Sequence, residues 1–175
     1  MSYEELIALV NEREVRVCGV DIGKSGAIVA NSGGQVYLAK MPEDTEVRVK
    51  IIKNAAPDIV YAEAVHTWRG QGIVSNGSLM EQKGFIHGVA SALQIPIKWV
   101  EPLRWMECFT IKRTKHFDTT RQWKGHLAEI AKEFSPDYLL DVINRETADA
   151  YLMWFWASCI EVGKPLPKKG SKLQF

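Results

Sequence analysis

The sequence predicts an α/β domain in which a mixed, five-stranded sheet carries helices on both faces. Two observations support this class. Three short apolar runs joined by glycine-containing turns come first, as in an antiparallel meander, and two further apolar runs then alternate with helical segments, as in parallel crossovers. A chain of 175 residues is also long enough to form a sizeable core, which buries roughly 70% of the unfolded surface.

The chain begins with a segment that has the signature of a capped helix, residues 2–12. Ser2 and Glu5 stand three residues apart, as in a capping box, and an apolar side follows. The antiparallel meander comes next, and its turns contain the glycines of residues 23–26 and 32–34. Its three strands are expected over residues 16–21, 27–30 and 35–39.

Helices and strands alternate in the rest of the chain. The run at 58–63 is almost wholly apolar, which is typical of a strand covered on both faces, and 97–100 is a second short strand. Helices are expected over residues 45–54, 75–94, 102–109 (a helical turn), 121–134 and 146–160, with a loop over 110–120. We therefore expect one domain over residues 1–160, followed by a basic tail over 161–175.

Composition narrows the classes of function. With 46% hydrophobic and 25% charged residues and no apolar run near the ~20 residues that cross a bilayer, no membrane segment is expected. The three cysteines are scattered, and the N-terminal segment carries acids, so we expect a reducing, cytoplasmic location without a secretory signal. The net charge is only +1, so a polyanionic partner must be met by local basic patches.

Four carboxylates stand where they can converge. Asp21 and Glu63 each end an apolar strand run, and ligands of α/β sheets bind beyond the carboxyl ends of strands. Glu146 and Asp149 are three residues apart at the start of the last predicted helix, so we expect them on one helical face. If that helix starts near the strand ends, all four acids meet.

Such a cluster needs neutralisation by protons or cations. Two like charges at ~4 Å repel by about 1 kcal/mol in water and about 4 kcal/mol at an effective dielectric constant of 20. Oxygen ligands without His or Cys favour Mg²⁺, with Mn²⁺ as a substitute. Two such ions could activate a water and stabilise the leaving oxygen of a phosphodiester, which is nuclease chemistry.

Other interpretations of these acids stay open. Asp21 could be a turn acid, Glu63 a surface acid, and Glu146 with Asp149 first-turn acids that complement the helix dipole. Sugar kinases and actin-like ATPases also place an Asp and glycines, as in residues 21–26, at a phosphate, although those folds carry a second copy of the unit and this chain does not. A compact ATPase or phosphotransfer domain and a non-catalytic DNA-binding module therefore remain alternatives.

The ordered motifs resemble those of RuvC Holliday junction resolvases, above all their phage-encoded relatives, in the RNase H-like superfamily. The resemblance covers roughly residues 17–158. The motifs that carry it are VDIGKSG with Asp21, YAEAVH with Glu63, WRGQG with the helix after it, and ETADA with Asp149. Glu146 stands at the motif position where the family commonly has an acid or His, so the sequence departs only mildly from the family pattern there.

The resemblance implies an RNase H-like fold and an activity. It implies a homodimeric, Mg²⁺-dependent endonuclease of DNA recombination and repair, which hydrolyses paired phosphodiester bonds of four-way junctions without a small-molecule cofactor. The acids Asp21, Glu63, Glu146 and Asp149 would hold metal. The helix after WRGQG would form the dimer; its small residues could instead pack tightly on the chain's own sheet.

Basic and aromatic residues are candidates for contact with DNA. The resemblance puts His66 where relatives insert a side chain among the junction's bases, and Trp68 and Arg69 follow in a glycine-rich loop. Trp68 could instead be buried. Five cations with a single acid among them, Asp118, mark the segment 110–126, which predicts phosphate contacts or else a solvated loop. These cations are Lys112, Arg113, Lys115, Arg121 and Lys124; the resemblance favours Lys124, then Lys115, near the cleaved phosphate.

Overall fold

The computed structural model describes residues 1–23, 25–66, 72–109, 111 and 119–164. Its centre is a mixed, five-stranded sheet of order β3-β2-β1-β4-β5. The strands are β1 (Val17–Asp21), β2 (Ala27–Ser32), β3 (Gln35–Lys40), β4 (Ile59–Glu63) and β5 (Ile97–Val100). The first three pair antiparallel, and β4 and β5 join β1 in parallel, so the predicted sheet is confirmed.

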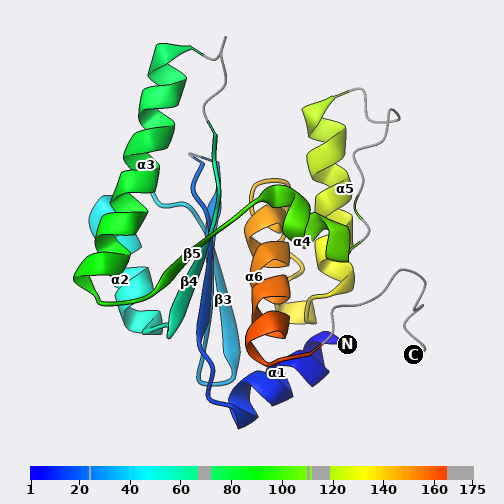
Figure 1. Cartoon of the computed structure of the whole chain (residues 1–175). Helices are drawn as coiled ribbons and strands as arrows, with labels where there is room; N and C mark the ends of the chain where they lie inside the picture. The colour runs from blue at the N-terminus through cyan, green and yellow to red at the C-terminus, as the bar shows by residue number, and fades with distance from the viewer. Residues whose placement is uncertain (24, 67–71, 110, 112–118, 165–175) are drawn as a thin grey trace.

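Helices cover both faces of the sheet (Figure 1). One face carries α2 (Thr45–Ala55) and α3 (Ile73–Ala92). The other carries α1 (Tyr3–Glu12), α4 (Pro102–Cys108), α5 (Thr120–Glu133) and α6 (Ala148–Glu161), and a short 3₁₀ helix (Asp137–Leu139) precedes α6. Among the described residues, no helix is long and apolar enough to span a bilayer.

Alternation along the strands divides the core into two layers. Val17 of β1 and Tyr61 of β4 belong to the layer that contains α6, whereas Cys18 and Val20 belong to the layer under α2 and α3. Since neighbouring side chains of a strand point to opposite faces, Asp21 shares the α6 face with Val17. The register of the sheet therefore directs the acids at the strand ends toward α6.

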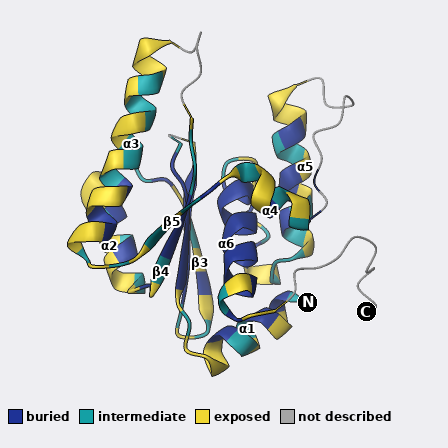
Figure 2. Cartoon of the chain, in the orientation of Figure 1, coloured by how far each residue is buried: buried dark blue, intermediate teal, exposed yellow. Residues whose placement is uncertain are grey.

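The helix α6 is buried along almost its whole length, as Figure 2 shows. It lies unusually close to β1 at Gly19, where an added Cβ would be 2.8 Å from the Cβ of Trp154. Trp154, Phe155 and Trp156 of this helix all lie in the core. This contact fixes the distance between α6 and the strand that ends in Asp21.

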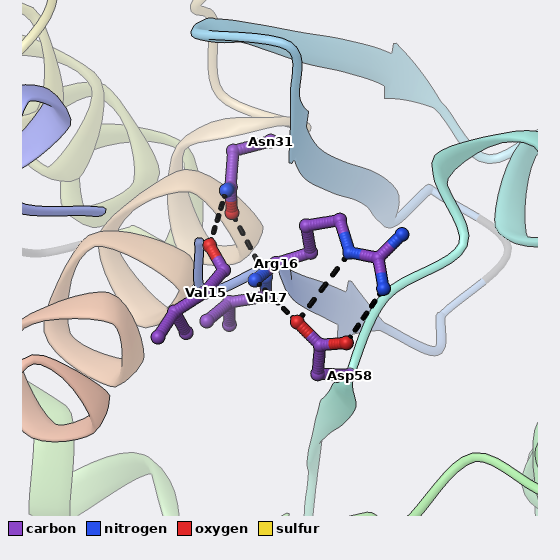
Figure 3. A network of polar contacts seen from close by, with 5 residues as sticks. All are labelled: Val15, Arg16, Val17, Asn31 and Asp58. Carbon is purple, nitrogen blue, oxygen red and sulfur yellow. Dashed lines mark hydrogen bonds and ion pairs between the residues drawn. The ribbon is translucent and has the colours of Figure 1, made fainter. Parts of the chain in front are cut away.

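A polar network at the amino ends of β1 and β4 sets their register (Figure 3). Arg16 N donates to Asp58 Oδ2 (2.8 Å) and its guanidinium to Oδ1 (2.7 Å), which pairs residues 42 apart. The buried Asn31 side chain accepts from Val17 N (2.9 Å) and donates to Val15 O (2.8 Å). The same offset of 42 residues carried to the other strand ends puts Asp21 beside Glu63.

The helix predictions hold with one consequential correction. The capping box of Ser2 and Glu5 is present at α1. The last helix begins at Ala148, so the prediction that it starts at residue 146 is wrong. Asn144 Oδ1 accepts from Glu146 N (2.8 Å), and this side-chain bond holds Glu146 in a turn before the helix.

Candidate active site

The strand ends of β1 and β4 supply the first two carboxylates. Asp21 is 8% exposed, and its Oδ1 accepts a hydrogen bond from Gly23 N (3.3 Å) in the turn that follows. This turn depends on Gly26, where a Cβ would lie 2.0 Å from the backbone oxygen of Asp21. Glycine is therefore required for the chain to fold back against the residue that carries the acid.

The third carboxylate comes from the first turn of α6. Asp149 is 7% exposed, and its Oδ2 accepts a hydrogen bond from Lys124 Nζ at 2.6 Å. Its Oδ1 is buried and has no hydrogen-bond partner among the described residues. A buried carboxylate oxygen without a donor costs free energy, so this atom is suited to a ligand that binds oxygen.

Helix α5 places Lys124 against this acid. It begins with a capping box, in which Thr119 Oγ1 accepts from Gln122 N (3.2 Å) and the Gln122 side chain accepts from Thr119 N (3.2 Å). Trp123 and Leu127 bury the inner side of the helix. The Lys124 side chain is 30% exposed, so its ammonium reaches Asp149 from the edge of the core.

These side chains lie close enough for their charges to shift one another's pKa. Burial first, and then the charges of Asp21 and Asp149, raise the pKa of Glu63 to about 8 against the opposing effect of Lys124. Burial and Asp149 also raise the pKa of Asp21. Burial opposes the charged form of Lys124, but Asp149, Asp21 and Glu63 outweigh it and raise its pKa. The cluster therefore lacks positive charge.

This donor set fits a hard divalent cation. The three carboxylates converge without a His or Cys ligand. The pKa values of Asp21 and Glu63 are raised, and Asp149 has a buried oxygen without a hydrogen-bond partner among the described residues. In the described part of the chain, no three acidic, His or Cys side chains stand close enough to hold an ion as arranged here. Lys124 instead donates to Asp149, so ion binding requires these side chains to move toward each other.

Glu146 does not join this cluster in the structure. Its carboxylate pairs with Lys40 Nζ at the end of β3 (2.7 Å), and its side chain is 42% exposed. The prediction that it shares a helical face with Asp149 is wrong, because it precedes the N-cap of α6. Asp21, Glu63 and Asp149 are thus the acids that the fold brings together.

The predicted DNA-contact residues are only partly described. His66 Nε2 lies 2.8 Å from Glu101 Oε1, and both side chains are more than half exposed. Arg121 is exposed in the first turn of α5. Trp68, Arg69, Lys112, Arg113 and Lys115 lie outside the described residues, as does most of the predicted tail.

The sequence prediction missed Glu101. It follows β5 directly, as an acid at the end of a parallel strand, and its charge contributes to the raised pKa of Glu63. The pattern that marked Asp21 and Glu63 as candidates, an acid at the end of a strand, therefore occurs again at Glu101. Its pairing with His66 could not be predicted from the sequence, since the two residues are 35 apart.

Comparison with known proteins identifies the fold. No family model and no curated protein matches the chain. Thermus thermophilus RuvC in complex with a Holliday junction substrate shares its fold, with a TM-score of 0.52, 15% identity, and coverage of 88% of this chain and 100% of that one. A second structure of Thermus thermophilus RuvC (TM-score 0.49, 16% identity, 88% and 100% covered) and the yeast mitochondrial Holliday junction resolvase (0.44, 11%, 89% and 86%) also align. The chain thus has a RuvC-like, RNase H-like fold.

Proposed function

We propose that this chain, which has the fold of RuvC, is a metal-dependent endonuclease that cuts phosphodiester bonds in four-way junctions and related branched DNA. The observation that carries the proposal is the electrostatic coupling of Asp21, Glu63 and Asp149 at one edge of the sheet. A RuvC of this fold has been captured with a Holliday junction substrate, which supports DNA as the substrate class.

The three acids would hold Mg²⁺, two ions in all, with Mn²⁺ as a substitute. When bound, such ions activate water and stabilise the charge on a phosphodiester's leaving oxygen. Two features of the acids suit such ions. The pKa of Glu63 is about 8, and Asp149 Oδ1 is a buried acceptor oxygen. Glu146, which the sequence also predicts as a ligand, would first have to leave Lys40.

Lys124 is the described cation best placed to act on the substrate. Its ammonium lies at the carboxylate cluster, 2.6 Å from Asp149, and carries a positive charge at neutral pH because its pKa is raised. From this position the ammonium would bind a phosphate oxygen of the substrate and stabilise the charge that develops on it. His66 and Arg121 would contact the strands nearby.

Affinity for DNA would come mostly from phosphate contacts, and binding should weaken steeply with salt. A homodimer would present two such sites to the two strands of a symmetric junction. The outward residues of α3 suit such an interface, since at Gly77, Gly84 and Gly88 an added Cβ meets no described atom within 4 Å. These three glycines are therefore not needed for packing on the chain's own sheet.

The test is a cleavage assay with labelled four-way, flap and duplex DNA, with and without Mg²⁺. We expect nicks on opposing arms of the junction in Mg²⁺ or Mn²⁺ and none without metal. The variant Asp21→Asn should bind the junction with unchanged affinity and lose cleavage at least a hundredfold. Full activity in Asp21→Asn would remove this residue from the mechanism.

The same assay tests the alternatives. A protein that binds the junction equally with and without metal and never nicks it would be a non-catalytic binding module, in which the Lys124–Asp149 ion pair is structural. ATP hydrolysis without nicking would identify a phosphotransfer domain instead.

A further inference from the structure

A cleft of about 600 Å³ opens between the β1–β2 turn, which follows Asp21 directly, and the first three turns of α3. Its lining includes Ile22, Gly23, Val74, Ser78, Leu79 and Gln82. Since Gly23 N donates to Asp21 Oδ1, one wall of the cleft is the turn that orients the Asp21 carboxylate. A group bound here would therefore contact the turn that orients a proposed metal ligand.

The α3 side of the cleft is unusually apolar for a surface. Ile73 and Val74 are 91% and 87% exposed, more than any other exposed large hydrophobic residue of the described chain. They form the tip of α3, and Val74 continues into the cleft together with Leu79. Adjacent exposed apolar side chains at the mouth of a cleft are characteristic of binding surfaces.

One polar group in the cleft has a fixed hydrogen-bonding character. The buried Arg48 guanidinium donates to Gln82 Oε1 and to the backbone oxygens of Pro42 and Glu43. Arginine only donates, so the Gln82 oxygen faces Arg48, and its NH₂ group, which has no hydrogen-bond partner among the described residues, faces away from Arg48 and can donate elsewhere. Gln82 therefore offers the cleft a hydrogen-bond donor rather than an acceptor.

We propose that this cleft binds one unstacked base of the DNA strand next to the cleaved bond and selects a base with an acceptor edge. This inference rests on the proposed nuclease function. Val74 and Leu79 would contact the face of the base, and the Gln82 amide would donate to a carbonyl or ring nitrogen on its edge. Unstacking costs least for a base that has lost its pairing partner, which links the cleft to branched substrates with incompletely paired bases.

Fluorescence of 2-aminopurine tests the unstacking. The reporter is placed in turn at each position near the mapped nick of a four-way junction and is measured with the non-cleaving Asp21→Asn protein. We expect one position to brighten severalfold on binding, because aliphatic side chains do not quench the fluorophore. Adding Val74→Ser, or Ser78→Leu to fill the cleft, should remove most of that increase.

The matched control is Val47→Ser, an exposed valine on α2 that does not line the cleft. It should leave the increase unchanged. If the wild-type protein nicks the junction but no position brightens, or if the cleft variants brighten it equally, the cleft is not a base site while the nuclease stands. A protein that neither binds nor nicks junctions overturns both proposals.

Base selection is tested with Gln82→Glu on a pool of junctions randomised around the nick. The variant keeps an oxygen for Arg48, so the fold is retained, but it replaces the donor in the cleft by an acceptor. We expect the preferred base at one position to change to one with an exposed amino group, with about tenfold slower cleavage of the original sequence. An unchanged preference would overturn the role of Gln82.

Discussion

Asp21 and Glu63 place carboxyl groups where an isolated charge is expensive. Each ends a strand whose central residues are buried, and burial is the largest cause of the raised pKa of both. A chain that needed only a turn acid would gain stability by leaving the group in water. The buried position is reasonable if a cation completes the site.

The variant Glu63→Gln tests this at the residue scale. The pKa of Glu63 rises from 4.5 to about 8 on folding, so between these values the folded state keeps a proton that the unfolded chain has lost. The free energy of unfolding therefore falls as the pH rises from 4.5 to 8. Glu63→Gln removes this loss, and its Tm should exceed that of the wild type by more at pH 8.5 than at pH 5.

Thermal unfolding followed by circular dichroism in metal-free buffer measures the difference. Mg²⁺ should then raise the Tm of the wild type at pH 8.5 more than that of the variant, since it binds the folded carboxylates. An identical pH dependence in the two proteins would show that Glu63 titrates normally.

Substitution of Lys124 separates charge from packing. Lys124→Met keeps the aliphatic stem but removes the ammonium that donates to Asp149, so cleavage at saturating junction should fall at least tenfold. Lys124→Arg keeps the charge and should retain part of the rate. Equal loss in both would point to exact ammonium geometry, whereas unchanged rates in Lys124→Met would exclude Lys124 from the reaction.

At the scale of secondary structure, the close contact of α6 with β1 decides where Asp149 lies. Gly19 lets the backbone of β1 approach Trp154. Helix α6 begins at Ala148, so its second residue, Asp149, lies near the strand ends. The turn that precedes α6 turns Glu146 toward Lys40 instead. Two acids three residues apart thus have different surroundings.

The pair of variants Glu146→Gln and Asp149→Asn measures this difference. Asp149→Asn should abolish cleavage, because it removes a charge from the coupled cluster. Glu146→Gln should lower the rate by less than about tenfold, because it breaks only an exposed ion pair, and such pairs contribute about 0–1 kcal/mol. Equal losses, measured as single-turnover rates at several Mg²⁺ concentrations, would restore Glu146 as a full ligand.

At the scale of the whole molecule, paired cleavage requires two active sites. The outer face of α3 is exposed at Gly84 and Gly88, and it lies on the side of the sheet opposite to α5 and α6 (Figure 1). An interface on this face would leave the carboxylates of both copies open to DNA. Close approach of two helices there needs small residues, which these positions provide.

The variant Gly88→Arg tests the dimer. An arginine at this position meets no described atom of its own chain within 4 Å of its Cβ, so the fold should be retained. Analytical ultracentrifugation should show a dimer for the wild type and a monomer for Gly88→Arg, and paired nicks should become single nicks. A variant that remains dimeric would place the interface elsewhere, and a monomeric wild type would contradict the homodimer.

The sequence by itself determined the class of sheet, its five strands and the acids at two strand ends, because these depend on local apolar periodicity and on glycine turns. It also predicted a helix over the α6 segment and marked Asp149 as a candidate ligand, whereas the family resemblance favoured Lys124. Only the tertiary structure decided which side chains meet. The 42-residue offset of β1 and β4, which Arg16 and Asp58 also share, puts Asp21 beside Glu63. Pairings such as Lys124 with Asp149, Lys40 with Glu146 and His66 with Glu101 join residues distant in the chain, and their geometry depends on helix packing and register rather than on local pattern.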